Sequence, residues 1–382
     1  MRKLQLVATV ALLMSAFGCG GGQSAKFTVG IAHVAGDYGF TQKNFLVEGA
    51  EEISQLGSDA IFIYLTPAFL TEYPDQSANL WPAAAPTSLA QLAQTSPYDQ
   101  VFHLPFKTIV LTAYTFANWD HVAGMAQSPA RQSAEENEFY QLTKYLYSKF
   151  SGSGKTFILK DWEGDWAALG GQSGVADNIS PGAVQDMTAW LKARQAGVTE
   201  ARNQANDSSM RVLNGAEVNR VLDYAQQGLT RVINAVVPEV NADMVTYSSY
   251  DSTTIGQDAA AMEQSFNLAL DTIEKLAPDP LGMGSRRILI SEYGLYENQL
   301  PGGTSWRAPA ILTTASQAGV YGAFLWNLYD NECLQPDGQP AEVDTPMGSP
   351  VRPADSDCRG LWVRRPDGST SAALAVLKQY WK

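Results

Sequence analysis

Two glutamates stand where apolar segments of this 382-residue chain give way to loops. Glu292 follows the run Ile288–Ile290 in R-I-L-I-S-E-Y-G-L-Y-E, and Glu163 follows Thr156–Leu159 in K-D-W-E-G-D-W. A near-continuous apolar run is typical of a strand buried on both faces of a parallel sheet. We expect both carboxyl groups at strand ends that open into an active-site mouth. A surface glutamate that happens to follow a strand is the alternative for each.

Two carboxyl groups among aromatic side chains can cleave a glycosidic bond without a cofactor. A neutral acid protonates the leaving oxygen, and an ionised partner attacks or stabilises the oxocarbenium-like centre. The three histidines (His33, His103 and His121) show no ligand spacing, and the chain has no C-x-x-C motif. We therefore expect no metal site and no cofactor. The strand ends are also expected to carry no lysine and no serine-nucleophile elbow.

The segments that must position these carboxyl groups alternate between strand and helix. Eight strands are expected, at Phe27–His33, Ala60–Leu65, Phe106–Tyr114, Thr156–Leu159, Met210–Leu213, Met244–Ser248, Ile288–Ser291 and Val320–Trp326. Eight helices are expected, at Asn44–Leu56, Ser88–Gln94, from a capping box at Ser133 and Glu136 to Phe150, from Ser180 onward, and at Leu222–Val237, Asp258–Ala277, Trp306–Ala318 and Thr370–Trp381.

This alternation predicts an α/β fold of parallel strands joined by helical crossovers. Eight units predict a single (β/α)8 TIM barrel with enlarged βα loops over residues 27–382. An open doubly wound sheet is the alternative, and it usually carries a glycine-rich phosphate turn after its first strand. Here the first turn reads V-A-G-D-Y-G-F, which lacks that motif.

In such a barrel, functional side chains lie at the carboxyl ends of the strands. The side chains predicted to bind substrate there are His33, Trp119, Trp162, Asp165, Trp166, Glu217, Tyr247, Tyr250, Trp326 and Asn327. Several also have a structural interpretation. His33 can be a hydrogen-bonded wall residue, Trp119 can pack within its loop, and Asp165 competes with Glu163 for the role of acid.

A barrel with one glutamate after strand four and another after strand seven resembles the retaining (β/α)8 glycoside hydrolases of clan A. Glu292 in I-S-E-Y-G matches the nucleophile, and Glu163 matches the general acid/base by position. Trp326 in F-L-W-N matches the strand-eight platform. Tyr247 in V-T-Y-S matches the strand-six tyrosine that often hydrogen-bonds the nucleophile. The chain departs from the pattern at Trp162, where most members have an asparagine that contacts the sugar 2-hydroxyl.

The resemblance implies a carbohydrate substrate and hydrolysis of its O-glycosidic bonds with retention of configuration. Retention implies carboxyl groups about 5–5.5 Å apart. We expect a raised pKa for Glu163, because Trp162 and Trp166 make its site partly apolar and Glu292 adds a like charge. Two alternatives stay open: a surface lipoprotein that binds glycans without cleaving them, and a barrel for another substrate class that needs a metal or cofactor.

The start of the chain predicts export. Residues 1–18 combine a basic start with a short apolar stretch, as signal peptides do. Cys19 follows, and the polar tether 19–26 resembles that of bacterial lipoproteins, whose cysteine is lipidated. Ordinary secretion after Gly18 is the alternative. Either route predicts an extracytoplasmic protein, secreted or held on the outer membrane or cell surface.

The net charge and the remaining cysteines agree with an extracytoplasmic location. A net charge of −13 argues against nucleic acid and against an anionic membrane surface, so a lipid on Cys19 is the one membrane contact expected. Cys333 and Cys358 are predicted to form a disulfide, as paired cysteines of exported proteins do. It would close a loop of about 25 residues, worth roughly 3 kcal/mol.

Overall fold

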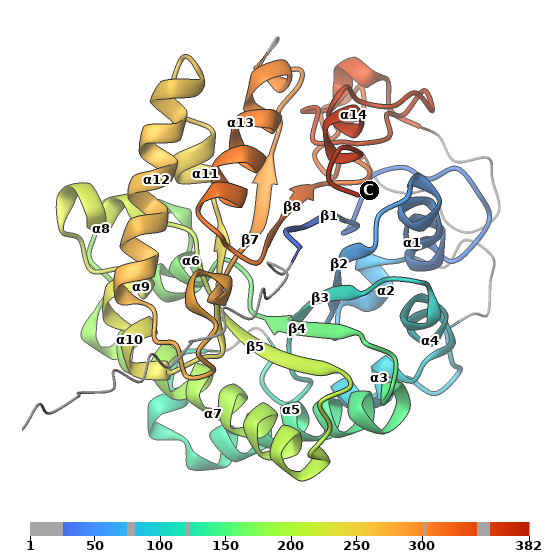
Figure 1. Cartoon of the computed structure of the whole chain (residues 1–382). Helices are drawn as coiled ribbons and strands as arrows, with labels where there is room; N and C mark the ends of the chain where they lie inside the picture. Colours follow the sequence, from blue (N-terminus) through green and yellow to red (C-terminus); the bar gives the residue numbers. More distant parts are fainter. Residues whose placement is uncertain (1–25, 75–80, 120–121, 301–302, 342–351, 382) are drawn as a thin grey trace, which may run out of the picture.

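The eight strands form a closed parallel barrel in chain order (Figure 1). This computed structural model describes residues 26–74, 81–119, 122–300, 303–341 and 352–381. The strands are β1 (Thr28–Ala32), β2 (Ala60–Leu65), β3 (Thr108–Ala113), β4 (Thr156–Lys160), β5 (Arg211–Val218), β6 (Met244–Ser248), β7 (Ile288–Gly294) and β8 (Gly322–Trp326). The barrel closes because β1 pairs with β8 from Thr28↔Gly322 to Ile31↔Leu325. The predicted TIM barrel is confirmed, and the open sheet is excluded.

Helices surround the barrel (Figure 1). They are α1 (Phe45–Leu56), α2 (Phe69–Glu72), α3 (Leu89–Ala93), α4 (Ser96–His103), α5 (Pro129–Phe150), α6 (Gly164–Leu169), α7 (Pro181–Ala205), α8 (Val221–Gln227), α9 (Val232–Ala235), α10 (Val237–Val240), α11 (Tyr250–Thr253), α12 (Ala259–Leu276), α13 (Thr304–Gln317) and α14 (Ala373–Leu377). Short 3-10 turns lie at Met125–Gln127, Gln172–Gly174, Gly284–Arg287 and Asp355–Asp357.

Three helix predictions differ from the structure. α5 begins at Pro129, not at the predicted capping box of Ser133, because proline suits the first turn of a helix. The segment predicted as one helix over Leu222–Val237 divides into α8, α9 and α10, since Gly228 ends α8 in a left-handed conformation (φ 71°). The last helix is also shorter than Thr370–Trp381.

Strand side chains alternate between the barrel interior and the helix layer. Phe62, Ile158 and Leu289 belong to one buried cluster inside the barrel. Their strand neighbours, such as Ile61 and Phe157, belong to the cluster that includes the helices. Because successive strand residues point to opposite faces, this parity decides which side chains reach the barrel mouth.

Strand β7 contains a β-bulge before Glu292, and this bulge changes the face of the barrel to which the following side chains point. Against β6, the paired residues are Thr246↔Leu289 and then Ser248↔Glu292, so β7 uses one residue more than β6 over this interval. A shift also occurs against β8. Leu289 faces the interior, so strict alternation would turn Ser291 inward and Glu292 outward. The extra residue instead returns Glu292 to the interior.

The loop after β8 is closed by a disulfide between Cys333 and Cys358, as predicted. Among the described residues, the one group of acidic, histidine or cysteine side chains close enough to share a metal ion is Asp330 with these two cysteines, whose sulfurs are joined to each other. The predicted signal 1–18 and Cys19 lie outside the described residues, as does all of the tether except Lys26. None of the helices described combines the length and apolar character needed to cross a membrane.

Candidate active site

A buried lysine joins two glutamates at the carboxyl end of the barrel. The Lys160 ammonium forms an ion pair with Glu217 and lies 3.4 Å from Oε1 of Glu292. All three side chains are at most 3% exposed. The prediction that the strand ends carry no lysine is wrong, because β4 extends to Lys160, one residue past its expected end. Alternation from Ile158, an interior residue, was the signal that places Lys160 inside.

Glu217 lies within β5, not in a loop after it, because this strand extends to Val218. Alternation from the interior residue Leu213 turns Glu217 inward. Its carboxylate accepts hydrogen bonds from the hydroxyl groups of Ser248 and Thr246 (3.2 Å for Thr246) as well as from Lys160. Glu217 therefore serves as the fixed counter-ion of Lys160.

Glu292 is held between Lys160 and the ring of Tyr250. The Tyr250 hydroxyl donates to Oε2 of Glu292 at 3.5 Å. A Cβ atom on Gly294 would lie 2.7 Å from the Tyr250 ring, so the glycine of S-E-Y-G makes room for this tyrosine. Burial raises the pKa of Glu292 to about 7, and the positive charge of Lys160 acts in the opposite direction.

Glu163 occupies a tight turn between β4 and α6. Its backbone is in the left-handed region (φ 40°, ψ 61°), which is strained for a residue other than glycine. A Cβ atom on Gly164 would lie 2.5 Å from the backbone oxygen of Glu217. The turn is therefore pressed against β5, and the W-E-G sequence reflects this close approach.

The environment of Glu163 favours its protonated form. Burial raises the pKa of Glu163 to about 9, and the negative charges of Glu292 and Glu217 contribute. Lys160 and a side-chain hydrogen bond from Trp166 act in the opposite direction. The predicted increase is confirmed. The surroundings of Glu163 thus favour its protonated form, whereas Lys160 favours the ionised form of Glu292.

An aromatic cleft of about 590 Å³ lies beside this turn, among the loops after β2, β3 and β4. Its lining includes five aromatic side chains: Tyr64, Tyr114, Trp119, Trp162 and Trp166. Trp119 and Trp162 are 39% and 41% exposed, although both are large hydrophobic residues. The backbone N–H of Trp162 donates to the Tyr114 hydroxyl at 3.2 Å, which ties the two loops together. The three predicted tryptophans of this side are therefore brought together around one cavity.

Trp326 lies in the mouth of the barrel, at the end of β8. Its ring centroid is 6.0 Å from that of Phe62, and the Lys160 ammonium lies over the same Phe62 ring at 4.7 Å from the centroid. The Trp326 indole donates to Oδ1 of Asn331 at 2.9 Å, which fixes the ring. The strand-eight tryptophan thus belongs to the same group of residues as Lys160.

Two of the predicted substrate contacts are wall residues. His33 packs against α1, its Nε2 lies 2.7 Å from the backbone oxygen of Phe45, and burial lowers its pKa to about 4. Asn327 accepts from the Val34 N–H at 3.2 Å and donates to the Val34 carbonyl at 2.7 Å. Since both side chains are fully buried and bound to backbone, the structure opposes the predicted contacts of these two residues with substrate.

Asp165 does not compete with Glu163 as the acid. Its carboxylate accepts hydrogen bonds from three backbone N–H groups at 2.8–3.1 Å, those of Asn219, Arg220 and Val232. These bonds fasten the loop after β4 to the loop after β5 and to the start of α9. Asp165 is fully buried, so its role is to position the turn that carries Glu163.

Tyr247 does not hydrogen-bond Glu292, and that prediction is wrong. Thr246 and Ser248 face the interior, so alternation turns Tyr247 outward. Its hydroxyl group instead bonds Asp251 and Ser252, the latter at 2.7 Å. Tyr250, three residues later, supplies the tyrosine contact to Glu292.

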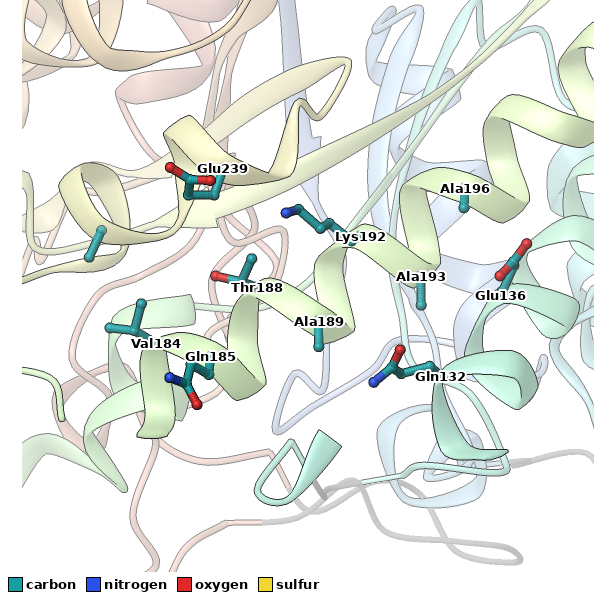
Figure 2. Close-up of a pocket in the computed structure, with 11 residues that line it drawn as sticks. Gln132, Glu136, Val184, Gln185, Thr188, Ala189, Lys192, Ala193, Ala196 and Glu239 are labelled. Atoms are coloured by element: carbon teal, nitrogen blue, oxygen red, sulfur yellow. The ribbon is translucent and has the colours of Figure 1, made fainter. Parts of the chain in front are cut away.

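A second groove, of about 610 Å³, lies on the outer helices (Figure 2). Gln132 and Glu136 of α5 line one side, Thr188 and Lys192 of α7 cross it, and Glu239 of α10 lies beyond (Figure 2). It shares no lining residue with the group at the strand ends. The carboxyl end of the barrel is therefore the candidate active site.

Comparison with known proteins supports the fold. No protein-family model matches the chain, and no curated protein matches it in sequence. Among solved structures, it is similar to a GH5 xyloglucan-specific endo-β-1,4-glucanase from a metagenomic library, in complex with cellotriose (TM-score 0.51, 12% identity, 92% of this chain and 95% of that chain covered).

Two further structures give the same result. A family 5 xyloglucanase from Paenibacillus pabuli matches with TM-score 0.50 and 11% identity over 94% of this chain and 99% of that chain. A GH5_18 protein from Bifidobacterium longum, in complex with Manβ1-4GlcNAc, matches with TM-score 0.52 and 13% identity over 93% and 78%. The resemblance to (β/α)8 glycoside hydrolases that the strand-end motifs predicted is thus confirmed at the level of the fold.

Proposed function

We propose that this protein is an extracytoplasmic retaining glycoside hydrolase that cleaves O-glycosidic bonds of a polysaccharide or oligosaccharide. One observation carries the proposal. Glu292 lies in β7, with its Oε1 3.4 Å from the Lys160 ammonium, which favours the carboxylate. Glu163 follows β4, where burial and the like charges of Glu292 and Glu217 raise its pKa and favour the neutral acid. That difference assigns Glu163 as acid/base and Glu292 as nucleophile.

The reaction proceeds in two displacements. Glu163 donates its proton to the leaving glycosidic oxygen while the Glu292 carboxylate attacks the anomeric carbon, which forms a glycosyl-enzyme ester. Glu163, now ionised, then takes a proton from water, and that water displaces Glu292. Lys160 favours the ionised form of Glu292 in the resting enzyme, because it is a buried cation 3.4 Å away. Retention requires the two carboxyl groups to lie about 5–5.5 Å apart when substrate is bound.

The aromatic cleft and the structural neighbours support a carbohydrate partner. Exposed indole faces such as those of Trp119 and Trp162 suit the apolar faces of sugar rings. Among the similar structures, the xyloglucan-specific glucanase holds cellotriose and the GH5_18 protein holds Manβ1-4GlcNAc. We propose Trp119, Trp162, Trp166, Tyr250 and Trp326 as the residues that contact substrate in this chain.

The Cys333–Cys358 disulfide supports a location outside the cytoplasm, since such bonds persist in oxidising compartments. We propose that residues 1–18 direct export and that Cys19 receives a lipid. Expression with labelled palmitate tests this, because Cys19→Ala should abolish the label. A wild-type protein without label, recovered free in the medium, would indicate secretion after Gly18 instead.

The decisive test is hydrolysis of a panel of polysaccharides and aryl glycosides by the wild type and by Glu292→Ala. The variant should lose nearly all turnover, and added azide should restore it by forming a glycosyl azide of inverted configuration, since azide attacks from the face that Glu292 vacates. Glu239→Ala, at an exposed position in the outer groove, is the matched control and should behave as wild type. Near-normal turnover by Glu292→Ala would overturn the nucleophile assignment.

A second candidate function is glycan binding without cleavage. The observation that favours it is the departure at Trp162, which stands directly before the acid, where most members of the clan that the chain resembles have an asparagine. In that case glycans bind, no reducing ends are released, and Glu163→Gln leaves binding unchanged. Reducing-end assays on the same glycans distinguish the two functions.

A further inference from the structure

The aromatic cleft contains a carboxyl group that the two displacements do not use. Glu72 ends α2, lines the cleft and is 9% exposed. Its Oε1 accepts a hydrogen bond from the Thr66 hydroxyl at 2.6 Å. Its Oε2 is buried and has no hydrogen-bond partner in the described part of the chain. The cleft-lining Thr112 hydroxyl, on the interior face of β3, is likewise unpaired there.

Unpaired buried polar atoms are costly, and native structures normally pair them with protein, water or a ligand. Here Glu72 and Thr112 line a cavity of about 590 Å³ whose other walls include five aromatic side chains. Many apolar contacts with a few convergent polar groups are the usual composition of a small-molecule site. Glu72 is thus placed to complete its hydrogen bonding with a bound molecule.

The charge of the cleft limits what that molecule can be. The described residues of its lining include no lysine, arginine or histidine. Two cations close to the lining are paired with carboxylates: Lys160 with Glu217, and Arg220, which lies over the Trp166 ring, with Asp223. Burial raises the pKa of Glu72 to about 7, so near neutral pH its carboxyl group can donate as well as accept a hydrogen bond. Such a wall suits hydroxyl groups, and its described residues offer a carboxylate no cation to pair with.

We propose that Glu72, together with Trp119, Trp162 and Trp166, forms a sugar-binding subsite for a neutral pyranose unit adjacent to the bond that is cleaved. Glu72 hydrogen-bonds a hydroxyl group of that unit, and the indole rings contact its C–H faces. The subsite selects neutral glycans and rejects uronic acids. This inference rests on the proposed function, because it names the substrate class of the same site.

Binding is measured in a Glu292→Ala background, so that no sugar is turned over. The probes are cellotriose, mannotriose and xylotriose, which are neutral, and trigalacturonate, which is anionic. Calorimetry and tryptophan fluorescence should detect at least one neutral trisaccharide and no trigalacturonate. Adding Glu72→Leu should weaken that binding about tenfold, the factor for one lost hydrogen bond at a buried polar group. Glu72→Gln keeps both a hydrogen-bond donor and an acceptor, so its dissociation constant for that trisaccharide should stay within about threefold of the value without this substitution.

Trp306→Ala is the matched control for Trp119→Ala, because Trp306 lies on α13, outside the cleft. Of these two tryptophan variants, only Trp119→Ala should weaken binding of the trisaccharide. Absence of binding by all three neutral probes, binding of trigalacturonate, or unchanged affinity in Glu72→Leu overturns the subsite. Failure of the proposed function gives a different result. In that case a neutral trisaccharide binds and Glu72→Leu weakens its binding, but the wild type hydrolyses no glycan.

Discussion

Replacing Lys160 with methionine should move the acidic limb of the pH–activity profile to higher pH. The ammonium lies 3.4 Å from Oε1 of Glu292, and both groups are buried. The nucleophile acts only when ionised, so activity is lost as the pH falls through the pKa of Glu292. Lys160 lowers that pKa, because a nearby positive charge favours the carboxylate. Without the cation the pKa rises, and ionisation then requires a higher pH.

The size of the shift follows from the distance. At 3.4 Å and an effective dielectric constant of about 20, two unit charges interact by about 5 kcal/mol. At about 1.4 kcal/mol for each pKa unit, that is an upper limit of roughly 3.5 units. Rearrangement of the buried site after loss of the cation offsets part of the change. We expect a net rise of about 1–3 units from about 7, which lowers the ionised fraction of Glu292, and hence kcat/KM at pH 7, by roughly 5- to 500-fold.

The assay is kcat/KM from pH 5 to pH 10 on the best substrate of the panel. The lost rate should recover at least in part as the pH rises, until deprotonation of Glu163 ends it. Because Lys160 also lowers the pKa of Glu163, the basic limb should move to higher pH as well. Lys155→Met is the matched control, since Lys155 bonds the carbonyl groups of Leu104 and Phe106 near the other end of β4. Loss of a buried ion-pair partner costs about 3–5 kcal/mol of stability, so Lys160→Arg provides a charged variant if the methionine variant does not fold. A rate loss that is equal at every pH would refute the electrostatic reasoning.

Three further predictions concern the acid, its turn and the disulfide. Glu163→Gln should lower kcat by about 10²–10⁴ for poor leaving groups and far less for activated aryl glycosides, as steady-state kinetics on both will show. Gly164→Ala should destabilise the fold by about 1–3 kcal/mol in urea titrations, because its Cβ would lie 2.5 Å from a β5 backbone oxygen, whereas Gly182→Ala, with open space around it, should not. Replacing Cys333 and Cys358 together by serine should cost about 3 kcal/mol, seen as a lower melting temperature that reducing agent no longer changes.

Local patterns in the sequence predicted the barrel and much of its site. The eight strands have apolar runs, and Gly or Pro separates many of them from the helices, so their order was readable without any tertiary contact. Strand order then brought Glu163, Glu292 and Trp326 to one end of the molecule, because parallel strands share a carboxyl edge. The disulfide followed from the two cysteines that remain after Cys19.

It was harder to predict which side chains of each strand point into the barrel. Lys160 was missed because the predicted end of β4 was one residue short, although its alternation with Ile158 was visible in the sequence. His33 and Tyr247 were expected at the mouth but face the helix layer. A shift of one residue reverses every side chain of a strand, so a strand end known to within one or two residues does not determine which side chain points inward.

Only the tertiary structure decided how Glu292 reaches the barrel interior. In the sequence, Glu292 has the parity of an outward side chain, since Leu289 faces the interior and strict alternation would turn Ser291 inward. The extra residue of β7, visible in its pairing with β6, reverses that orientation. The sequence alone determined that a glutamate follows the seventh strand. Its approach to Lys160 depends on hydrogen-bond register between strands, which is a property of the paired sheet and not of either segment.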